Sequence, residues 1–149
     1  MDENLDYRIA LLMDGPNMFK SDFNEIHEKV KCYGQVELRE VYLDKHSSPA
    51  LIESALNNGF RPVIEAPEDV DTALTARIME VACSPRYSHI NLIAIASRDS
   101  DYVPVVNRVK EYEKKTMMIG LTTNGNSTSL KNTVDFFEAV DERHSEYQY

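Results

Sequence analysis

The 149-residue chain lacks several features that assign a protein quickly to a functional class. Its two cysteines, Cys32 and Cys83, are too few for a disulfide framework, and neither belongs to a CxxC pair. Its four histidines are scattered, so they do not have the spacing of a zinc site. No apolar run approaches the roughly 18 residues of a membrane span, and residues 1–8 are acidic and polar, unlike a signal peptide. We therefore expect a cytoplasmic protein with reduced cysteines and no contact with a membrane.

An excess of positive charge is also missing. Sixteen Lys and Arg residues against 25 Asp and Glu residues give a formal net charge of −9. Proteins that bind nucleic acid by electrostatics alone are usually basic. An acidic domain can bind nucleic acid if part of its acid binds divalent cations and its basic side chains cluster elsewhere. The same net charge also favours solubility without any specific function.

The length and the apolar content of 42% suit one globular domain with a substantial core. We predict a single domain over residues 1–149, with its core at about 7–140 and a frayed tail at 141–149.

Apolar runs alternate with helical patterns along this length. Strands are predicted at 7–13, 36–43, 61–66, 90–96, 116–121 and 136–139, and helices at about 19–33, 49–58, 70–83, 103–112 and 130–134. In the fourth helix we expect Val103, Val106, Val109 and Tyr112 on the inner face. Alternating strands and helices favour a parallel sheet covered on both faces. The fully apolar runs at 7–13, 90–96 and 116–121 are the candidates for its centre.

Acidic side chains follow two of these central strands. Asp14 ends the first strand, before a Gly15-Pro16-Asn17 turn, and Asp99 and Asp101 follow the strand at 90–96. The carboxyl ends of parallel strands share one edge, where open α/β sheets place their sites. Asp71, at a helix start, could lean over that edge. Convergent carboxylates repel one another unless protons or cations intervene, and Mg²⁺ and Mn²⁺ prefer such oxygen ligands.

Helix capping is a simpler interpretation of the same side chains. An Asp at a helix start accepts main-chain N–H bonds and faces the positive end of the helix dipole. This would explain Asp99 or Asp101 alone, and Asn17 could cap the helix that follows it or orient an attacking water. The acids before the helix at 70, which are Glu65, Glu68, Asp69 and Asp71, would mostly compensate its dipole. The polar loop at 122–129 could bind phosphate or cap the next helix.

Four segments, taken in order, match a known pattern. They are IALLMDGPN at 9–17, Val70-Asp71, IASRDSDYVPVV at 95–106 and STSL at 127–130. With them the chain resembles NYN domains, a branch of the PIN-like nucleases, and is most similar to archaeal single-domain members. The resemblance runs from about residue 7 to 140. It implies an α/β fold, a three-layer α/β/α sandwich with a central, mostly parallel sheet, and cleavage of RNA phosphodiester bonds dependent on Mg²⁺ or Mn²⁺.

The resemblance also implies roles for individual residues. Metal-binding and catalytic roles fall on Asp14, Asp71, Asp99 and Asp101, and substrate-binding roles on Asn17, Ser97, Arg98 and Ser127. Two positions depart from the pattern: many relatives carry a Lys where this chain has Glu68-Asp69, and many carry a further acid at the position of Arg77. If the long Arg77 side chain reaches the cleft, we expect it to pair with Asp71 or Asp101 and replace a second metal ion.

The sequence thus predicts a metal-dependent endoribonuclease whose partner is RNA, with a homodimer left open. The alternative is a catalytically weak or inactive module that keeps the fold and binds RNA or a protein. A receiver-like signalling domain also has acids at parallel strand ends, but it needs a Lys after the last central strand. Residues 116–125 (TMMIGLTTNG) contain none. A nuclease assay with and without Mn²⁺ distinguishes the first two.

Overall fold

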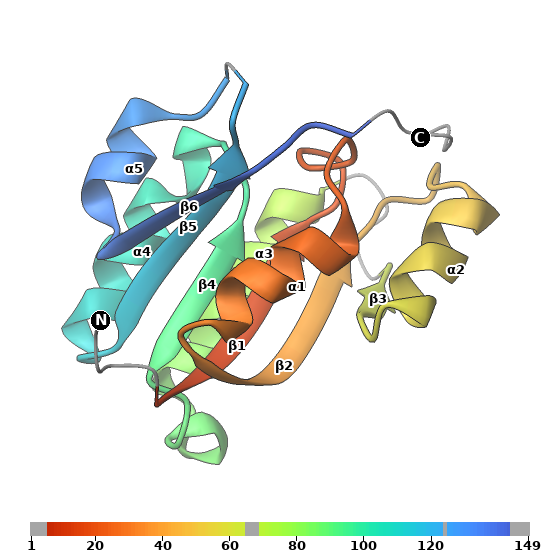
Figure 1. Ribbon diagram of the computed structural model, residues 1–149. Helices are drawn as coiled ribbons and strands as arrows, with labels where there is room; N and C mark the ends of the chain where they lie inside the picture. Colours follow the sequence, from red (N-terminus) through yellow and green to blue (C-terminus); the bar gives the residue numbers. More distant parts are fainter. Residues whose placement is uncertain (1–5, 65–68, 124, 144–149) are drawn as a thin grey trace.

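The computed structural model describes residues 6–64, 69–123 and 125–143. Its strands are β1 (Tyr7–Asp14), β2 (Gly34–Tyr42), β3 (Arg61–Val63), β4 (Leu92–Ala96), β5 (Lys115–Leu121) and β6 (Phe136–Val140). Its helices are α1 (Phe23–Lys31), α2 (Pro49–Asn57), α3 (Val70–Cys83), α4 (Val103–Glu111) and α5 (Thr128–Thr133), with short 3₁₀ turns η1 (Pro85–Tyr87) and η2 (Ser100–Tyr102). The strands form one all-parallel sheet in the order β3-β2-β1-β4-β5-β6 (Figure 1). The predicted α/β fold is confirmed, and β1 and β4 lie at its centre.

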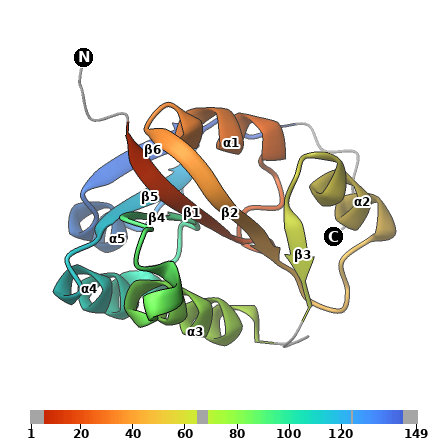
Figure 2. The ribbon, with the colours of Figure 1, turned by 90° about the horizontal axis from the view of Figure 1, so that it is seen from below.

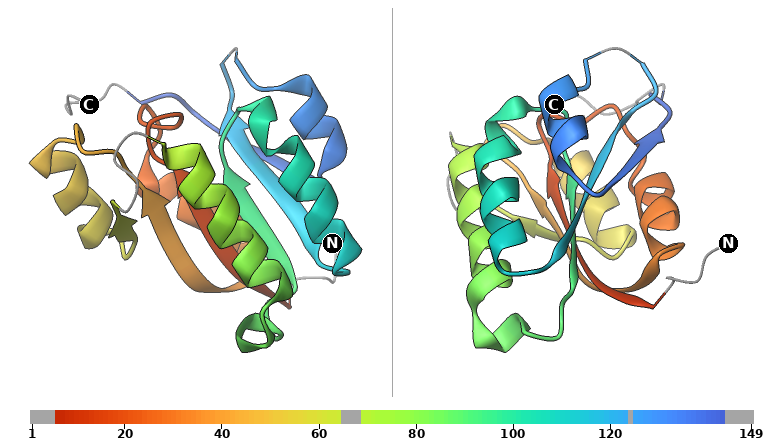
Figure 3. Two further views of the ribbon diagram at one scale, coloured as in Figure 1. Left: turned by 180° about the vertical axis from the view of Figure 1, so that it is seen from behind. Right: turned by 90° about the vertical axis from the view of Figure 1, so that its left-hand side faces the viewer.

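Helices cover both faces of this sheet. Because successive side chains of a strand point to opposite faces, Leu11 of β1 packs in the cluster that includes α1 and α2. Leu12, its neighbour, packs in the other cluster, with α3, α4 and α5. Figure 2 shows α1 on one side of the sheet and α3 and α4 on the other, and the right-hand view of Figure 3 shows the three layers from the side. Every residue of β4 is buried, so the ends of the two central strands are held firmly in place.

Local capping sets where the first two helices begin. Ser48 accepts a hydrogen bond from the Leu51 N–H at 3.1 Å, and Pro49 opens α2, as predicted. In α1 the cap is Asp22, which accepts from the main-chain N–H of Asn24 at 2.8 Å. The prediction that this helix begins near residue 19 is therefore wrong, and so is the capping interpretation of Asn17. Asn17 belongs to the turn that follows β1.

One prediction about the inner face of α4 is also wrong. Tyr112 is 44% exposed, whereas Tyr102, just before the helix, is completely buried. The η2 turn, which the helical pattern did not reveal, brings Tyr102 under the helix. Glu65 and Glu68, the end of the predicted third strand, and residues 144–149 of the predicted tail lie outside the described residues. No described helix is long and apolar enough to cross a membrane.

Candidate active site

The register of the central strands brings three acidic loop starts to one edge of the sheet. Met13 of β1 pairs with Ala96 of β4, so Asp14 and Ser97 leave the sheet side by side and Asp99 follows two residues later. On its other side, β1 pairs Asp14 with Tyr42 of β2, and Asp44 follows two residues after Tyr42. Three neighbouring strands therefore each supply a carboxylate at their carboxyl ends.

A cavity of about 380 Å³ lies at this edge. Its lining consists of Asp14, Pro16, Asn17, Asp44, Val70, Asp71 and Asp99. The structure thus gathers four of the predicted site residues in one place, with Asp71 supplied by the first turn of α3. Asp44 was missed by sequence reasoning. It follows the predicted strand at 36–43 directly, so the strand-end rule that selected Asp14 would also have selected it.

Asp14 is the most enclosed of these acids, with 6% of its surface exposed. Its Oδ2 accepts a hydrogen bond from the Tyr102 hydroxyl at 2.9 Å, and its Oδ1 accepts one from the Asn17 N–H at 3.3 Å. Burial raises the pKa of Asp14, and the charges of Asp99 and Asp71 raise it further, outweighing the two hydrogen bonds. A cation in the cavity would reverse the effect of these neighbours.

Asp99 lines the cavity and also caps a turn. Its Oδ1 accepts from the Asp101 N–H at 2.9 Å, and its own N–H donates to the Ser97 hydroxyl at 3.1 Å. Capping and cavity lining are therefore not exclusive at Asp99. Ser97 is completely buried and supports Asp99 from behind. Asp101 is exposed, and it is not among the described residues that line the cavity.

Asp71 and Asp44 each accept a hydrogen bond from a main-chain N–H close to them in the sequence. The Asp71 carboxylate accepts from the Thr72 N–H at 3.1 Å, and that of Asp44 accepts from the His46 N–H at 2.9 Å. Interaction with the Asp69 carboxylate, which favours a protonated Asp71 as donor, and partial burial raise the pKa of Asp71, whereas the pKa of Asp69 is lowered.

Arg98 and Ser127 are not among the described residues that line the cavity, but Arg98 contacts Asn17, which is. The Arg98 N–H donates to Asn17 Oδ1 at 2.8 Å, and its guanidinium Nη2 donates to the Asn17 main-chain oxygen, also at 2.8 Å. Ser127 donates its N–H to the Arg98 main-chain oxygen at 2.9 Å, and its hydroxyl accepts from the Leu130 N–H at the start of α5. Of the two interpretations of the loop at 122–129, the structure thus shows capping.

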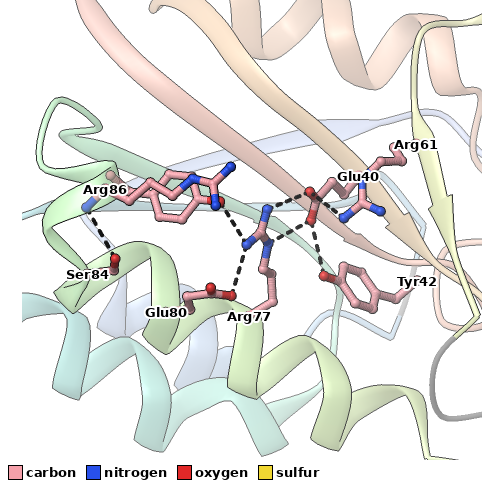
Figure 4. Close-up of polar contacts among 8 residues, drawn as sticks. Glu40, Tyr42, Arg61, Arg77, Glu80, Ser84 and Arg86 are labelled. Carbon is pink, nitrogen blue, oxygen red and sulfur yellow. Dashed lines mark hydrogen bonds and ion pairs between the residues drawn. The ribbon is translucent and has the colours of Figure 1, made fainter.

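Arg77 faces away from the cavity, so the expectation that it pairs with Asp71 or Asp101 is wrong. Its guanidinium donates to both oxygens of Glu40 on β2, at 3.0 and 2.8 Å. It also donates to Glu80 at 2.9 Å and to the Tyr87 hydroxyl at 3.1 Å (Figure 4). Glu40 is nearly fully buried, and a buried carboxylate needs a cationic partner more strongly than an open cavity does. An acid at position 77 would therefore approach Glu40 and Glu80.

The donor chemistry of the cavity fits a hard divalent cation. In the described part of the chain, no three His, Cys, Asp or Glu side chains are arranged to hold a metal ion by themselves. The lining nevertheless offers four carboxylates and one amide, and these are oxygen donors. Mg²⁺ keeps several waters and is usually bound through one or two carboxylates together with substrate phosphates. Spread carboxylates around an open volume are consistent with a hydrated ion of this kind.

A parallel α/β/α sandwich with acids at the carboxyl ends of its central strands has the architecture of a PIN-like domain. The chain belongs to the NYN domain family, a family of PIN-like nucleases, and matches its sequence pattern over residues 8–141. The family predicted from the four sequence segments is thereby confirmed.

One sequence relative and one solved structure are similar to the chain. It is 38% identical over 141 residues to the uncharacterized protein MJ0482 of the archaeon Methanocaldococcus jannaschii, covering 92% of this chain and 57% of that protein. The chain thus spans little more than half the length of this relative. Its fold is similar to the crystal structure of VPA0982 from Vibrio parahaemolyticus, a protein of unknown function, with a TM-score of 0.76 and 21% identity. That match covers 95% of this chain and 98% of the other, and at this identity it shows the fold alone.

Proposed function

We propose that this chain is an endoribonuclease that depends on Mg²⁺ or Mn²⁺. One observation carries the proposal: the buried Asp14 shares a single cavity with Asp71 and Asp99, in a chain of a nuclease family. Asp14, Asp71 and Asp99 would hold the ion. We keep Asp101 as a fourth predicted ligand, which would have to turn toward the cavity from its exposed position. Asp44 adds a carboxylate from β2.

A bound divalent ion supplies an activated water and stabilises the charge that develops on a phosphodiester. The chain itself fixes the ligands. Tyr102 and the Asn17 N–H each hold one oxygen of Asp14, and the Asp101 N–H holds one oxygen of Asp99. None of the described lining residues is Ser, Cys or His, so the nucleophile is water rather than a side chain. The water oxygen bonds to phosphorus and the water loses a proton to solvent, while the bond from phosphorus to the ribose oxygen breaks and that oxygen leaves with the electron pair and takes up a proton from solvent.

Charge makes binding of RNA dependent on cations. The chain carries a net charge of −9, and the cavity is lined by four acids. RNA phosphates are repelled by such a surface unless divalent ions lie between the two. Affinity for RNA is therefore expected to rise with Mg²⁺ and to fall with added monovalent salt.

The organisation as one domain, the homodimer and the cytoplasmic location remain predictions.

The test is cleavage of single-stranded and structured RNA in Mn²⁺, in Mg²⁺ and in a chelator. Asp99→Asn should lose roughly 10²- to 10³-fold in rate, as expected when one electrostatic stabiliser is removed. Glu53→Gln, which neutralises an exposed acid on α2, serves as the control of equal charge and should keep full rate. RNA that is bound but left intact by the wild-type protein in Mn²⁺ would instead identify a binding module that keeps the fold.

A further inference from the structure

Arg98 connects three loops at the rim of the cavity. Its main-chain N–H donates to Asn17 Oδ1 at 2.8 Å, and its guanidinium reaches the same oxygen from Nε at 3.4 Å. Nη2 donates to the Asn17 main-chain oxygen at 2.8 Å. On its other side, the Arg98 main-chain oxygen accepts from Ser127. Three donors of one arginine therefore converge on two oxygens of Asn17.

Asn17 in turn contacts Asp14, so its position affects the orientation of the Asp14 carboxylate. The Asn17 N–H donates to Asp14 Oδ1 at 3.3 Å, so the position of the Asn17 main chain decides where one oxygen of the buried acid points. The hold on Asn17 uses the planar fork of the guanidinium, which a lysine cannot reproduce. Among the described residues, no carboxylate lies within ion-pair distance of Arg98. Its side chain is thus engaged by oxygens of the turn after β1.

The loop before Ser127 leaves room for the Arg98 guanidinium. A Cβ atom on Gly125 would lie 2.9 Å from Arg98 Nη1, closer than side-chain contacts allow, and Gly125 has a φ of +108°. A glycine suits this backbone conformation, and it also leaves room for the guanidinium.

We infer that Arg98 is a positioning residue: it holds Asn17, and through the Asn17 N–H the Asp14 carboxylate, in the orientation for binding the cation. The inference rests on the proposed function, and it replaces the predicted contact of Arg98 with substrate by a contact within the protein. Partners behind metal ligands typically change metal affinity about 10- to 100-fold when they are removed.

The first experiment uses Arg98→Lys, which keeps the charge and removes the fork. Its affinity for Mn²⁺, measured by calorimetry without RNA, should fall about 10- to 100-fold, while KM for RNA, measured at Mn²⁺ concentrations that saturate the variant, changes little. Arg8→Lys is the matched control, because Arg8 pairs with Glu37 at the opposite end of β1, and it should bind Mn²⁺ as the wild type does. Unchanged affinity for Mn²⁺ with a raised KM would make Arg98 a phosphate contact and overturn the inference.

The second experiment needs no metal. Hydrogen exchange of the Asn17 amide reports whether the turn after β1 is held, since local opening sets the exchange rate. In metal-free Arg98→Lys the Asn17 amide should exchange at least about 10-fold faster, and in Arg8→Lys at the wild-type rate. Gly125→Ala, which brings a Cβ atom to 2.9 Å from Arg98 Nη1 and also strains the loop at a φ of +108°, should act in the same direction. If the Asn17 amide exchanged at the wild-type rate in both Arg98→Lys and Gly125→Ala, the inference would be refuted. If the wild type did not bind Mn²⁺, the proposed function would be refuted, and exchange of the Asn17 amide would still test whether Arg98 holds Asn17.

Discussion

Replacing Arg77 by Met tests how α3 is joined to the sheet. The side chain of Glu40 is 3% exposed and that of Arg77 15%, so the pair is nearly removed from water. In Arg77→Met, Glu40 would keep two partners among the described residues. Arg61 donates to it at 3.0 Å, and the Tyr42 hydroxyl donates to its other oxygen. Removing one member of a buried ion pair lowers the free energy of unfolding by about 3–5 kcal/mol, because the other charge stays buried without its partner.

The structure places the expected loss at the lower end of that range. Arg61 remains, and the bond from Arg77 to Glu80 counts little because the Glu80 side chain is 54% exposed. We therefore expect a loss of about 3 kcal/mol at pH 7 in chelator, or roughly 6–12 °C in Tm for a chain of this size. Arg86→Met is the matched control: Arg86 also lies over the Tyr87 ring but has no bond to Glu40 in the described contacts, and it should cost little.

The pH dependence gives the prediction its sign. Burial opposes ionisation of Glu40, but the hydrogen bonds from Arg77 and Arg61 outweigh burial and lower its pKa below 4.5. This stabilisation is present above pH 4.5 and is lost as the pH falls through the lowered pKa. In Arg77→Met burial prevails and the pKa of Glu40 rises, so the deficit should shrink as acid neutralises the carboxyl. The assay is chemical unfolding at pH 7 and pH 4. A deficit below 1 kcal/mol at pH 7, on the order of a surface ion pair, or one that grows in acid, would refute the reasoning.

Three further variants test the site and its support. In chelator, Asp14→Asn should be as stable as the wild type or slightly more stable, because repulsion between Asp14 and the neighbouring acids is relieved. The variant should also lose the rise in Tm that Mn²⁺ gives the wild type. A large loss of Tm in chelator would show that Asp14 has a structural role. Tyr102→Phe should cost about 1–3 kcal/mol at pH 7, because it leaves a buried Asp14 oxygen unpaired, and the cost should shrink in acid as Asp14 protonates; urea unfolding at two pH values measures both. Gly15→Ala should cost about 1–3 kcal/mol, since its Cβ would lie 2.7 Å from the Tyr42 carbonyl oxygen; wild-type stability in urea would show that the two strand ends can move apart.

Much of the fold was predictable because the burial of strands leaves a plain pattern. Buried parallel strands need apolar side chains on both faces, and the runs at 7–13, 90–96 and 116–121 are β1, β4 and β5. The start of α2 was predictable because Ser48 and Pro49 act locally. Asp14 and Asp99 were found by position at strand ends, and they do line one cavity.

What could not be predicted depends on tertiary partners. A long side chain such as Arg77 selects its partner in space, and the buried Glu40 is not recognisable as such in the half-polar segment at 36–43. Asp22 and Asn17 are both good cap residues, and the sequence does not reveal that Asp22 is the one that caps α1. The inner position of Tyr102 follows from a 3₁₀ turn that has no periodicity of its own. Asp44 could have been predicted from its position after a strand, but that strand lacks the uninterrupted apolar run of a central strand.

The sheet order also governs how the chain matures during synthesis. β1 is synthesised before the other strands of the sheet, yet its hydrogen-bonding neighbour β4 begins about 80 residues later, as the bond between Arg8 and Asn91 across 83 positions shows. At typical rates of translation the edge of β1 that β4 will cover waits roughly 4–16 s. During that time an apolar strand is open to pairing with other chains. The cavity takes Asp14 from the end of β1 and Asp99 from the loop after β4, so it forms only after Asp99 has been synthesised.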